Sequence, residues 1–462
     1  MTIEERVRRD LRTTGENIVP AEPEWDHVAR RLASTARPPA KQPRWSTHRG
    51  RAISLAGLAV AIVAAAVALV VVNRPAPHSA RVLTGNAPAA SSATADSATT
   101  LPTAGGAAAL PSVSTTTLPP MTLTVPPPKP VPVPAGFSPV SVTWISAKTG
   151  WVLGVVPPGS LVLAHTTDGG TTWAQAPALP AGLTYHDQFN SPASHSGVDR
   201  VRFGDSADGW MFGPELWATH DGGNSWHKVS GLPPMDINTL EAGSGMVYAV
   251  GDVLGDSTGG AFASPVASDA WKALAGSNVD PGSRLALAGA SVYATSGTGG
   301  TISALTPAAV TLLGRPCADV NSGLLTTIDG VAATTDTVSA ECTYNQAAGS
   351  SKKLIVVSRD GGRTWHGAGT APFGGVAIYL AVAPNGTYVI SAEGGDSVLY
   401  RSTDGGVTWT TVYTDTADGG APIVELGFTD DNRGVAIVQV PNGQDHMLVT
   451  VDGGATWTTA KF

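Results

Sequence analysis

Residues 402–409 read Ser-Thr-Asp-Gly-Gly-Val-Thr-Trp, and the same pattern, [ST]-x-D-G-G-x-[ST]-W, occurs five times in the chain. We call these segments the DGG turns, and they occupy residues 166–173, 219–226, 358–365, 402–409 and 450–457. Successive tryptophans are 53, 139, 44 and 48 positions apart. The long gap is about three times the shorter spacing, so we expect two degenerate repeats inside it, at 268–274 and near 304–314. The sequence therefore predicts seven repeats.

Each repeat predicts the same run of strands. Upstream of the DGG turn lies an apolar strand, a short polar turn and a Gly followed by an aromatic residue or Val, as in 141–154 and 201–213. Charged residues are only 14% of the chain, whereas Gly is abundant at 54 residues, which disfavours a helical protein. Four strands in about 45 residues are typical of one propeller blade. We expect an all-β fold, a seven-bladed β-propeller of four-stranded blades over residues 137–462.

The DGG turns themselves predict a local structural role. Their glycines supply the positive φ of a tight turn, the Asp carboxylate accepts backbone N–H groups, and the Trp packs between blades. The carboxylates resemble catalytic groups, but we expect them to be structural. The residues concerned are Asp168, Trp173, Asp221, Trp226, Asp360, Trp365, Asp404, Trp409, Asp452 and Trp457.

The repeated motif is identified as the Asp box, or bacterial neuraminidase repeat. Residues 137–462 resemble Asp-box propellers, which include sialidases, sortilin-type receptors, xyloglucanases and photosystem II assembly factors. The resemblance implies a fold rather than an activity, since these proteins do different things. It implies sialidase chemistry only if an Arg-Ile-Pro motif, three substrate-gripping arginines and a Tyr–Glu pair are present, and this chain has no Arg-Ile-Pro.

Other catalytic and metal motifs are also missing from the sequence. The ten histidines form no His-Glu-x-x-His motif and no cluster along the chain, and we find neither a Gly-x-Ser-x-Gly motif nor a phosphate-binding loop. We therefore expect no catalytic residue, no metal and no cofactor.

A ligand would meet the face opposite the DGG turns. That face is formed by the connectors between blades and by the loops joining second to third strands. The longest such connector, residues 179–197, offers Tyr185, His186 and Asp187 as candidate ligand-binding residues, with Gln188 and His195 beside them.

Two arginines follow on the first strand of the next repeat. Arg200 and Arg202 lie on one side of that strand, because side chains alternate with a period of two. They could hold an anionic group, or they could simply be paired with Asp199 and Asp205. Both alternatives remain open.

An uncharged run over 52–72 predicts a transmembrane helix. It has 21 residues, which span about 31 Å as a helix, the thickness of a bilayer core. Residues 1–51 carry 11 of the 28 Lys and Arg residues and 7 of the 36 acids. The positive-inside rule then places the N-terminus in the cytoplasm and residues 137–462 outside.

The segments on either side of this run are not part of the propeller. Within the basic tail 1–51 we expect short helices at 2–16 and 24–34, which either dock a cytoplasmic partner or only set the topology. The tail resembles the N-terminal tails of actinobacterial single-pass proteins, some of them anti-sigma factors. Residues 73–136 are rich in Pro, Ala, Ser and Thr, so we expect a disordered stalk.

The only two cysteines are Cys317 and Cys342. We place the first in the connector into the fifth blade and the second in the loop between that blade's second and third strands, on the same face. An oxidising, extracytoplasmic setting permits a disulfide between them. Two buried free thiols are the alternative.

The function that follows is a binding or scaffolding module at the cell surface. We expect a membrane-anchored, extracytoplasmic, non-catalytic propeller whose partners are the cytoplasmic membrane and an extracellular protein or glycan. The net charge of -8 argues against nucleic acid as a partner. A sialidase-like glycoside hydrolase and a transmembrane sensor that signals through the N-terminal helices are the alternatives.

Overall fold

The computed structural model describes residues 130–462, except 188–193, 256–258, 277–278, 290, 297–299, 321–326, 348, 416–419 and 441–442. Contacts divide the chain into Met1–Asn73 and Arg74–Phe462, and every described residue belongs to the second unit. The tail 1–51, the predicted transmembrane helix 52–72 and the stalk up to residue 129 lie outside the described residues. In the described part of the chain, no helix has the length and apolar character needed to cross a bilayer.

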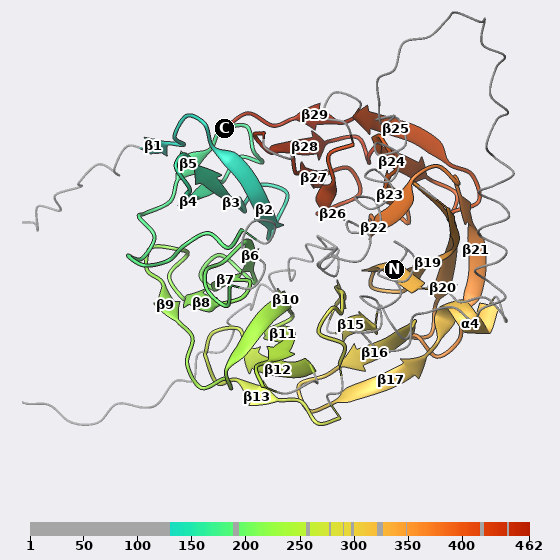
Figure 1. The fold of residues 1–462 in the computed structure, drawn as a ribbon, viewed down its shortest axis with the longest axis horizontal. Coiled ribbons are helices and arrows are strands. Elements are labelled where there is room, and N and C mark those ends of the chain that lie inside the picture. The colour runs from blue at the N-terminus through green and yellow to red at the C-terminus, as the bar shows by residue number, and fades with distance from the viewer. Residues whose placement is uncertain are drawn as a thin grey trace, which may run out of the picture. The chain divides into compact units, whose positions relative to one another are not determined.

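Seven antiparallel sheets stand in a ring, so the predicted seven-bladed propeller is confirmed (Figure 1). Blade 1 holds β2 (Ser138–Trp144), β3 (Gly150–Val156), β4 (Ser160–Thr166) and β5 (Ala174–Gln175). Blade 2 holds β6 (Arg200–Phe203), β7 (Gly209–Phe212), β8 (Leu216–Thr219) and β9 (His227–Lys228). Blade 3 holds β10 (Met235–Gly243), β11 (Met246–Val253), β12 (Gly259–Pro265) and β13 (Lys272–Ala273).

The other four blades repeat this order. Blade 4 holds β14 (Leu285–Ala288), β15 (Ser291–Ser296), β16 (Thr301–Leu305) and β17 (Val310–Gly314). Blade 5 holds β18 (Thr327–Ala333), β19 (Val338–Ala347), β20 (Ser350–Ser358) and β21 (His366–Ala371). Blade 6 holds β22 (Val376–Val382), β23 (Tyr388–Glu393), β24 (Ser397–Ser402) and β25 (Thr410–Asp415). Blade 7 holds β26 (Ile423–Phe428), β27 (Gly434–Val438), β28 (His446–Thr450) and β29 (Thr458–Thr459).

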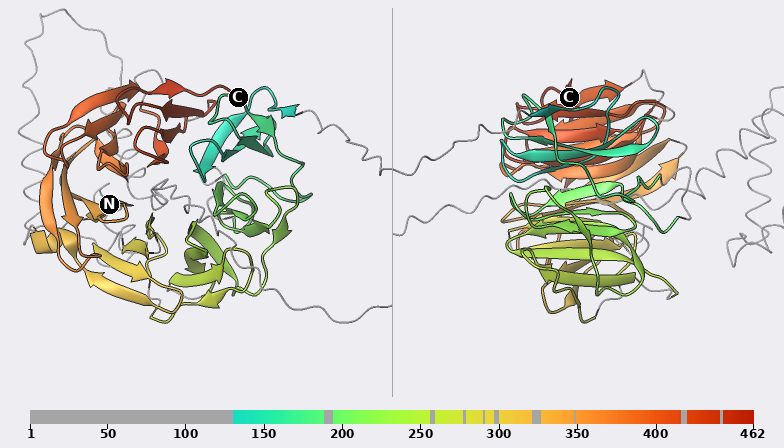
Figure 2. Two further views of the ribbon diagram at one scale, coloured as in Figure 1. Left: turned by 180° about the vertical axis from the view of Figure 1, so that it is seen from behind. Right: turned by 90° about the vertical axis from the view of Figure 1, so that its left-hand side faces the viewer.

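The first strand of each blade faces the axis and the fourth lies at the rim (Figure 1). Figure 2 shows the same ring from behind and from the side. The antiparallel order places all first-to-second and third-to-fourth strand turns on one face, which we call the turn face. The interblade connectors and the loops joining second to third strands form the opposite face, which we call the loop face. The five DGG turns lie on the turn face, as the sequence predicts.

The two degenerate repeats are complete blades. Segment 268–274 contains β13 of blade 3, and segment 304–314 contains β17 of blade 4. Both blades form a fourth strand without a DGG turn, and an apolar cluster packs blade 3 against blade 4 through Val250 and Leu285. Most of the hydrophobic core lies between adjacent blades. One such cluster joins blades 1 and 2 through Leu163 and Val201, and another joins blades 7 and 1 through Ile437 and Val152.

Each DGG turn is held by its own carboxylate. In blade 6, Asp404 Oδ1 accepts hydrogen bonds from Ser402 Oγ at 2.8 Å and from the backbone N of Thr408 at 2.9 Å. Asp404 Oδ2 accepts one from Thr408 Oγ1 at 2.6 Å. Gly405 and Gly406 have φ of 77° and 95°, values that favour glycine. The same contacts recur at Asp168, Asp221, Asp360 and Asp452.

The tryptophans of the DGG turns pack at blade boundaries, as predicted, and they also make a contact within their own blade that we did not predict. The ring of Trp226 packs edge-on against that of Phe203, at the end of the first strand of its own blade, with the ring centroids 6.0 Å apart. Trp226 also belongs to the hydrophobic cluster between blades 1 and 2. Trp173 and Trp457 make the equivalent within-blade contacts with Trp144 and Phe428. The ring thus covers the turn-face end of its own blade as well as a blade boundary, because the tight turn directs it back over the sheet.

The ring closes between blades 1 and 7 through side chains and packing. Blade 7 is built from one continuous segment, 423–459, and in the described residues it takes no strand from the N-terminal side. Glu425 on β26 accepts hydrogen bonds from Ser141 Oγ at 2.9 Å and from the backbone N of Val142 at 2.8 Å. The ring of Phe137 lies 4.8 Å from that of Phe462. Figure 1 accordingly shows the C-terminus beside blade 1.

A short strand precedes blade 1. β1 (Val131–Pro132) pairs with the rim strand β5, with Val131 opposite Gln175 and Pro132 opposite Ala174. Both residues fall in the segment 73–136 that we assigned to the stalk, but they belong to the sheet of blade 1. Proline is tolerated here because an edge strand has one row of N–H groups without a partner strand.

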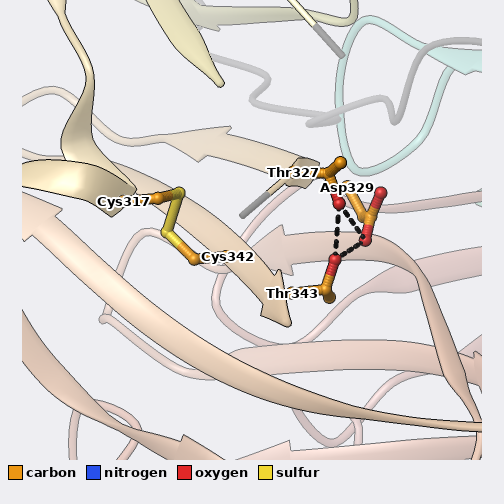
Figure 3. The surroundings of a disulfide bond; sticks show 5 residues. All are labelled: Cys317, Thr327, Asp329, Cys342 and Thr343. Atoms are coloured by element: carbon orange, nitrogen blue, oxygen red, sulfur yellow. Dashed lines mark hydrogen bonds between the residues drawn. A yellow bond between two sulfur atoms is a disulfide. The ribbon is translucent and has the colours of Figure 1, made fainter. Parts of the chain in front are cut away.

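Cys317 and Cys342 form a disulfide, with their Cα atoms 5.6 Å apart (Figure 3). Cys317 lies on the connector helix α4 (Pro316–Val320). Cys342 lies within β19, opposite Leu354 of β20, and not in the loop where we predicted it. The error arose because β19 and β20 are long, so the hairpin turns several residues later than in the other repeats.

Candidate ligand-binding site

A cavity of about 610 Å³ opens on the loop face between blades 1 and 7. Its walls come from the segment entering β2, the β3–β4 loop, the connector after blade 1 and the β27–β28 loop. The lining includes Ser138, Val155, Val156, Pro157, Tyr185, Asp187, Gln439, Val440, Gln444 and Asp445. Two of the sequence-predicted residues, Tyr185 and Asp187, are therefore cavity residues.

The cavity combines an apolar wall with acceptor groups and lacks Lys or Arg among its lining residues. Burial raises the pKa of the Tyr185 hydroxyl well above its usual range, and the carboxylates of Asp199 and Asp187 raise it further. Tyr185 is therefore a neutral hydroxyl at physiological pH. Gln439 Oε1 is buried without a hydrogen-bond partner among the described residues. These groups suit hydroxyl, amide or cationic donors on a ligand.

Asp445 shapes one side of this cavity. Its Oδ1 accepts the backbone N–H of Val440 at 2.8 Å, and its own backbone N donates to Ser138 Oγ at 2.8 Å. Burial raises the pKa of the Asp445 carboxyl. The carboxylate therefore orders the β27–β28 loop, and the backbone N–H of Asp445 ties that loop to the start of β2 in blade 1.

His186 is not among the residues that line the cavity. Its backbone N donates to Val198 O at 3.0 Å, in a short parallel bridge between residues 185 and 198. Its Nδ1 is buried and has no hydrogen-bond partner among the described residues. The alternation of side chains along this extended segment explains why Tyr185 and Asp187 reach the cavity and His186 does not.

Arg202 is fully engaged inside the ring. Its Nε donates to Glu241 Oε1 at 3.1 Å and its Nη1 to Glu425 Oε1 at 3.2 Å. The side chain is 2% exposed. Asp205, which we considered as its partner, instead accepts the backbone N–H groups of Ala207 and Asp208. Arg202 thus links blades 2, 3 and 7.

Arg200 is buried with looser partners. Its Nε lies 3.8 Å from Asp199 Oδ1 and its Nη1 lies 3.9 Å from Glu425 Oε1. Burial raises the pKa of Asp199 to about 6, although the positive charge of Arg200 opposes this shift. Of the two alternatives that the sequence left open for Arg200, pairing with Asp199 therefore has a geometric basis.

A third buried arginine was missed by the sequence analysis. Arg284, just before β14, lies over the ring of Tyr379 with its guanidinium carbon 4.6 Å from the ring centroid, and it donates to Ile378 O. Its Nη2 is buried and has no hydrogen-bond partner among the described residues. Nothing in the sequence signals this residue, because blade 4 carries no DGG turn and the contact joins blade 4 to blade 6.

Across from Arg284, blade 5 contributes acidic groups. Asp329 on β18 accepts hydrogen bonds from Thr327 and Thr343 (Figure 3). Burial raises the pKa of Asp329, while Thr343 and then Arg284 lower it. Burial also raises the pKa of Glu341 well above its ordinary value. The positive charge of Arg284 thus acts on two buried carboxyl groups of the neighbouring blade.

The carboxylates of the DGG turns are occupied by structural hydrogen bonds. Hydrogen bonds from Thr408 and Ser402 lower the pKa of Asp404 to about 2. The pKa values of Asp168, Asp221 and Asp452 are also lowered to about 2. A carboxylate in this state is a poor general acid near neutral pH.

Within the described residues, one group of three side chains could hold a metal ion: His220, His227 and Asp269, on the turn face. The histidines show no cluster along the chain, but two of them come together in space here. The hairpin joining β8 to β9 brings the ring centroids of His220 and His227 to 5.7 Å from each other, although the two residues are seven positions apart in the sequence.

No known family model matches the chain, and no curated protein matches it either. Among solved structures, YCF48 bound to a D1 peptide shares 19% identity, covers 70% of this chain and 96% of its own, and has a TM-score of 0.48. An ancestral GH74 enzyme shares 12% identity over 70% of this chain and 46% of its own, with a TM-score of 0.45. PorZ, a surface component of the type-IX secretion system of Porphyromonas gingivalis, shares 13% identity over 72% of this chain and 39% of its own, with a TM-score of 0.40.

Proposed function

We propose that this chain is a membrane-anchored binding module whose propeller lies outside the cell and receives a protein or glycan ligand at the loop-face cavity. The observation that carries the proposal is the cavity itself. It encloses about 610 Å³, within the usual range for ligand pockets, and contains Tyr185 and Asp187. Its lining mixes valine and proline with a phenol, carboxylates and side-chain amides, a combination that suits polar groups on a semi-apolar ligand.

The position of the cavity also supports binding rather than chemistry. The repeated carboxylates that resemble catalytic groups belong to the turn face, where each holds its own turn. Asp445 of the cavity accepts a backbone N–H and orders a loop. Binding without bond cleavage is therefore the function that we assign to the propeller.

Anchoring rests on the sequence. The run 52–72 is uncharged, and the basic residues cluster before it. A stalk over 73–129 would then separate the propeller from the bilayer. A scaffold at the cell surface needs this arrangement, because its ligand face has to reach partners beyond the membrane.

The test uses the full-length chain purified in detergent and applied to an array of bacterial surface glycans and extracytoplasmic proteins. For any ligand found, Tyr185→Phe and Asp187→Asn should each weaken binding about tenfold, the loss of one hydrogen bond involving a charged or buried group. Thr410→Ala, on the exposed rim of blade 6, is the matched control and should leave binding unchanged.

Two results would contradict the proposal. A ligand whose affinity is unaffected by both cavity variants would place the binding site elsewhere. Release of the fluorophore from a fluorogenic sialoside, abolished by a cavity substitution, would instead support the glycoside hydrolase alternative.

A further inference from the structure

Three side chains that ligate metals converge on the turn face between blades 2 and 3. His220 belongs to the DGG turn of blade 2, His227 begins β9, and Asp269 lies in the turn between β12 and β13 of blade 3. His227 Nε2 lies 2.5 Å from Asp269 Oδ2, and His220 Nε2 lies 3.5 Å from the same oxygen. One ligand atom from each residue can thus be chosen so that all lie within 4.8 Å of one another.

The orientation of His220 is set by a fourth residue. Asp208, in the turn between β6 and β7, places its Oδ1 2.5 Å from His220 Nδ1. A carboxylate on Nδ1 holds that nitrogen as the N–H and leaves the Nε2 lone pair directed toward Asp269. Histidines that bind metals commonly have such a carboxylate on the other ring nitrogen.

Asp269 has unused capacity as well. Its Oδ1 is a buried atom without a hydrogen-bond partner among the described residues. A buried carboxylate oxygen without a donor is costly, and a cation bound to this carboxylate would offset that cost. This observation is independent of the distances between the histidines and Asp269.

The pattern is particular to blade 2. In the other DGG turns, the residue before the Asp is Thr167, Arg359, Thr403 or Val451. Only His366 of blade 5 matches the position of His227, directly after the Trp, and its turn has Arg359 where blade 2 has His220. Local turn chemistry therefore does not require either histidine.

We propose that His220, His227 and Asp269 bind a divalent transition-metal ion of the zinc class, with Asp208 orienting His220. Zinc takes imidazole nitrogen and carboxylate oxygen at about 2.0–2.2 Å, so tetrahedral ligand atoms lie roughly 3.3 Å apart. The 3.5 Å separation of His220 Nε2 and Asp269 Oδ2 already fits. The 2.5 Å contact of His227 Nε2 with Asp269 has to lengthen, and the two imidazole nitrogens, which lie within 4.8 Å of each other, have to adopt the same spacing. The partial exposure of His227, at 52%, leaves room for water as the fourth ligand.

The ion would join blade 2, which has a DGG turn, to blade 3, which lacks one. Blade 2 contributes both imidazoles and blade 3 contributes the carboxylate, so the ion would cross-link neighbouring sheets on the turn face. Because the cavity lies on the loop face, this site is separate from the proposed ligand site.

The test titrates zinc chloride into the metal-free full-length chain, by calorimetry and by thermal denaturation. We expect one ion per chain at this site and a higher melting temperature. His227→Ala and Asp269→Asn should each weaken this binding at least tenfold and remove the zinc-dependent rise. Cobalt(II) bound to the same protein should give the absorption of a tetrahedral site, and the two variants should not give it.

His366→Ala is the matched control, since it removes the histidine at the same position of blade 5. Its zinc affinity should equal that of the unaltered chain. Circular dichroism of the metal-free variants separates a lost site from a lost fold. Zinc binding that survives both His227→Ala and Asp269→Asn, or that falls equally in His366→Ala, would overturn the proposal.

Discussion

Arg202 and Glu425, 223 positions apart in the sequence, form a buried ion pair. The pair connects blade 2 to blade 7, the two blades on either side of blade 1. Glu425 also accepts hydrogen bonds from Ser141 and Val142 of blade 1. One carboxylate therefore holds three consecutive blades at the place where the two ends of the propeller segment meet. Closure of the ring depends on side chains at this point.

Glu425→Gln should lower the free energy of unfolding by about 1.5–3 kcal/mol, because the buried Arg202 guanidinium then keeps only Glu241 as its counter-charge. The measurement is urea denaturation of the full-length chain. Lys228→Met is the control, because it removes an exposed ion pair with Glu215 at 2.8 Å and should cost less than about 1 kcal/mol. Equal costs for the two variants would refute the closing role of Glu425.

Asp404→Ala should lower the melting temperature and leave ligand binding unchanged. The change removes the acceptor for Ser402 Oγ, Thr408 Oγ1 and the Thr408 backbone N–H, so the turn loses the groups that fix it. Differential scanning calorimetry and the ligand array give the two readouts. Lost binding with an unaltered melting temperature would show that the DGG turn contacts the ligand.

The DGG turns should also determine how the propeller responds to acid. Folding lowers the pKa of Asp168, Asp221, Asp404 and Asp452 from 3.8 to about 2. A folded-state pKa below the unfolded value stabilises the protein above about pH 4, and this contribution is lost as the pH falls through 2. Unfolding monitored between pH 5 and 2 should therefore be steeper for the unaltered chain than for Asp404→Ala. Identical pH profiles would contradict the assignment.

Thiol titration of the denatured, non-reduced chain should find no free cysteine. Replacing both Cys317 and Cys342 by serine should lower stability by about 3 kcal/mol in the chain-entropy model, for a separation of 25 residues. Urea denaturation of the double variant measures the loss. Two reactive thiols in the unreduced chain would show that the bond does not form in the protein as isolated.

Protease added to intact spheroplasts should digest residues 137–462 and spare residues 1–51. This outcome follows from the basic flank before 52 and the uncharged run behind it. Antibodies against each end of the chain, with and without detergent, read out the two regions. A protected propeller would contradict the proposed topology.

The architecture could be predicted because each repeat is recognisable from residues that are close together in the sequence. A DGG turn needs its glycines, carboxylate and hydroxyls within eight residues, so five blades can be recognised directly and two more by spacing. The direction of strands then places Tyr185 on the loop face. These inferences depend only on contacts that are near in the sequence.

Long-range pairings could not be predicted in the same way. Glu425 meets Arg202, and Arg284 meets Tyr379, only because inner strands of different blades reach the same height along the axis. That height depends on bulges such as the one between Ile423 and Glu425, which no residue pattern reveals. Our prediction of the position of Cys342 was wrong for a related reason, since the length of the hairpin between second and third strands varies from blade to blade.

The contact between Phe137 and Phe462 has a consequence for the connectivity of the propeller. These two rings lie 4.8 Å apart, and both ends of the seven-blade segment therefore reach the same edge of blade 1. A short peptide linker from 462 back to 137 would span them, and new termini could then be opened in the exposed connector near Gly231. Such a circular permutant would keep every blade intact, so the order in which the blades follow one another along the gene is separable from the ring that they build.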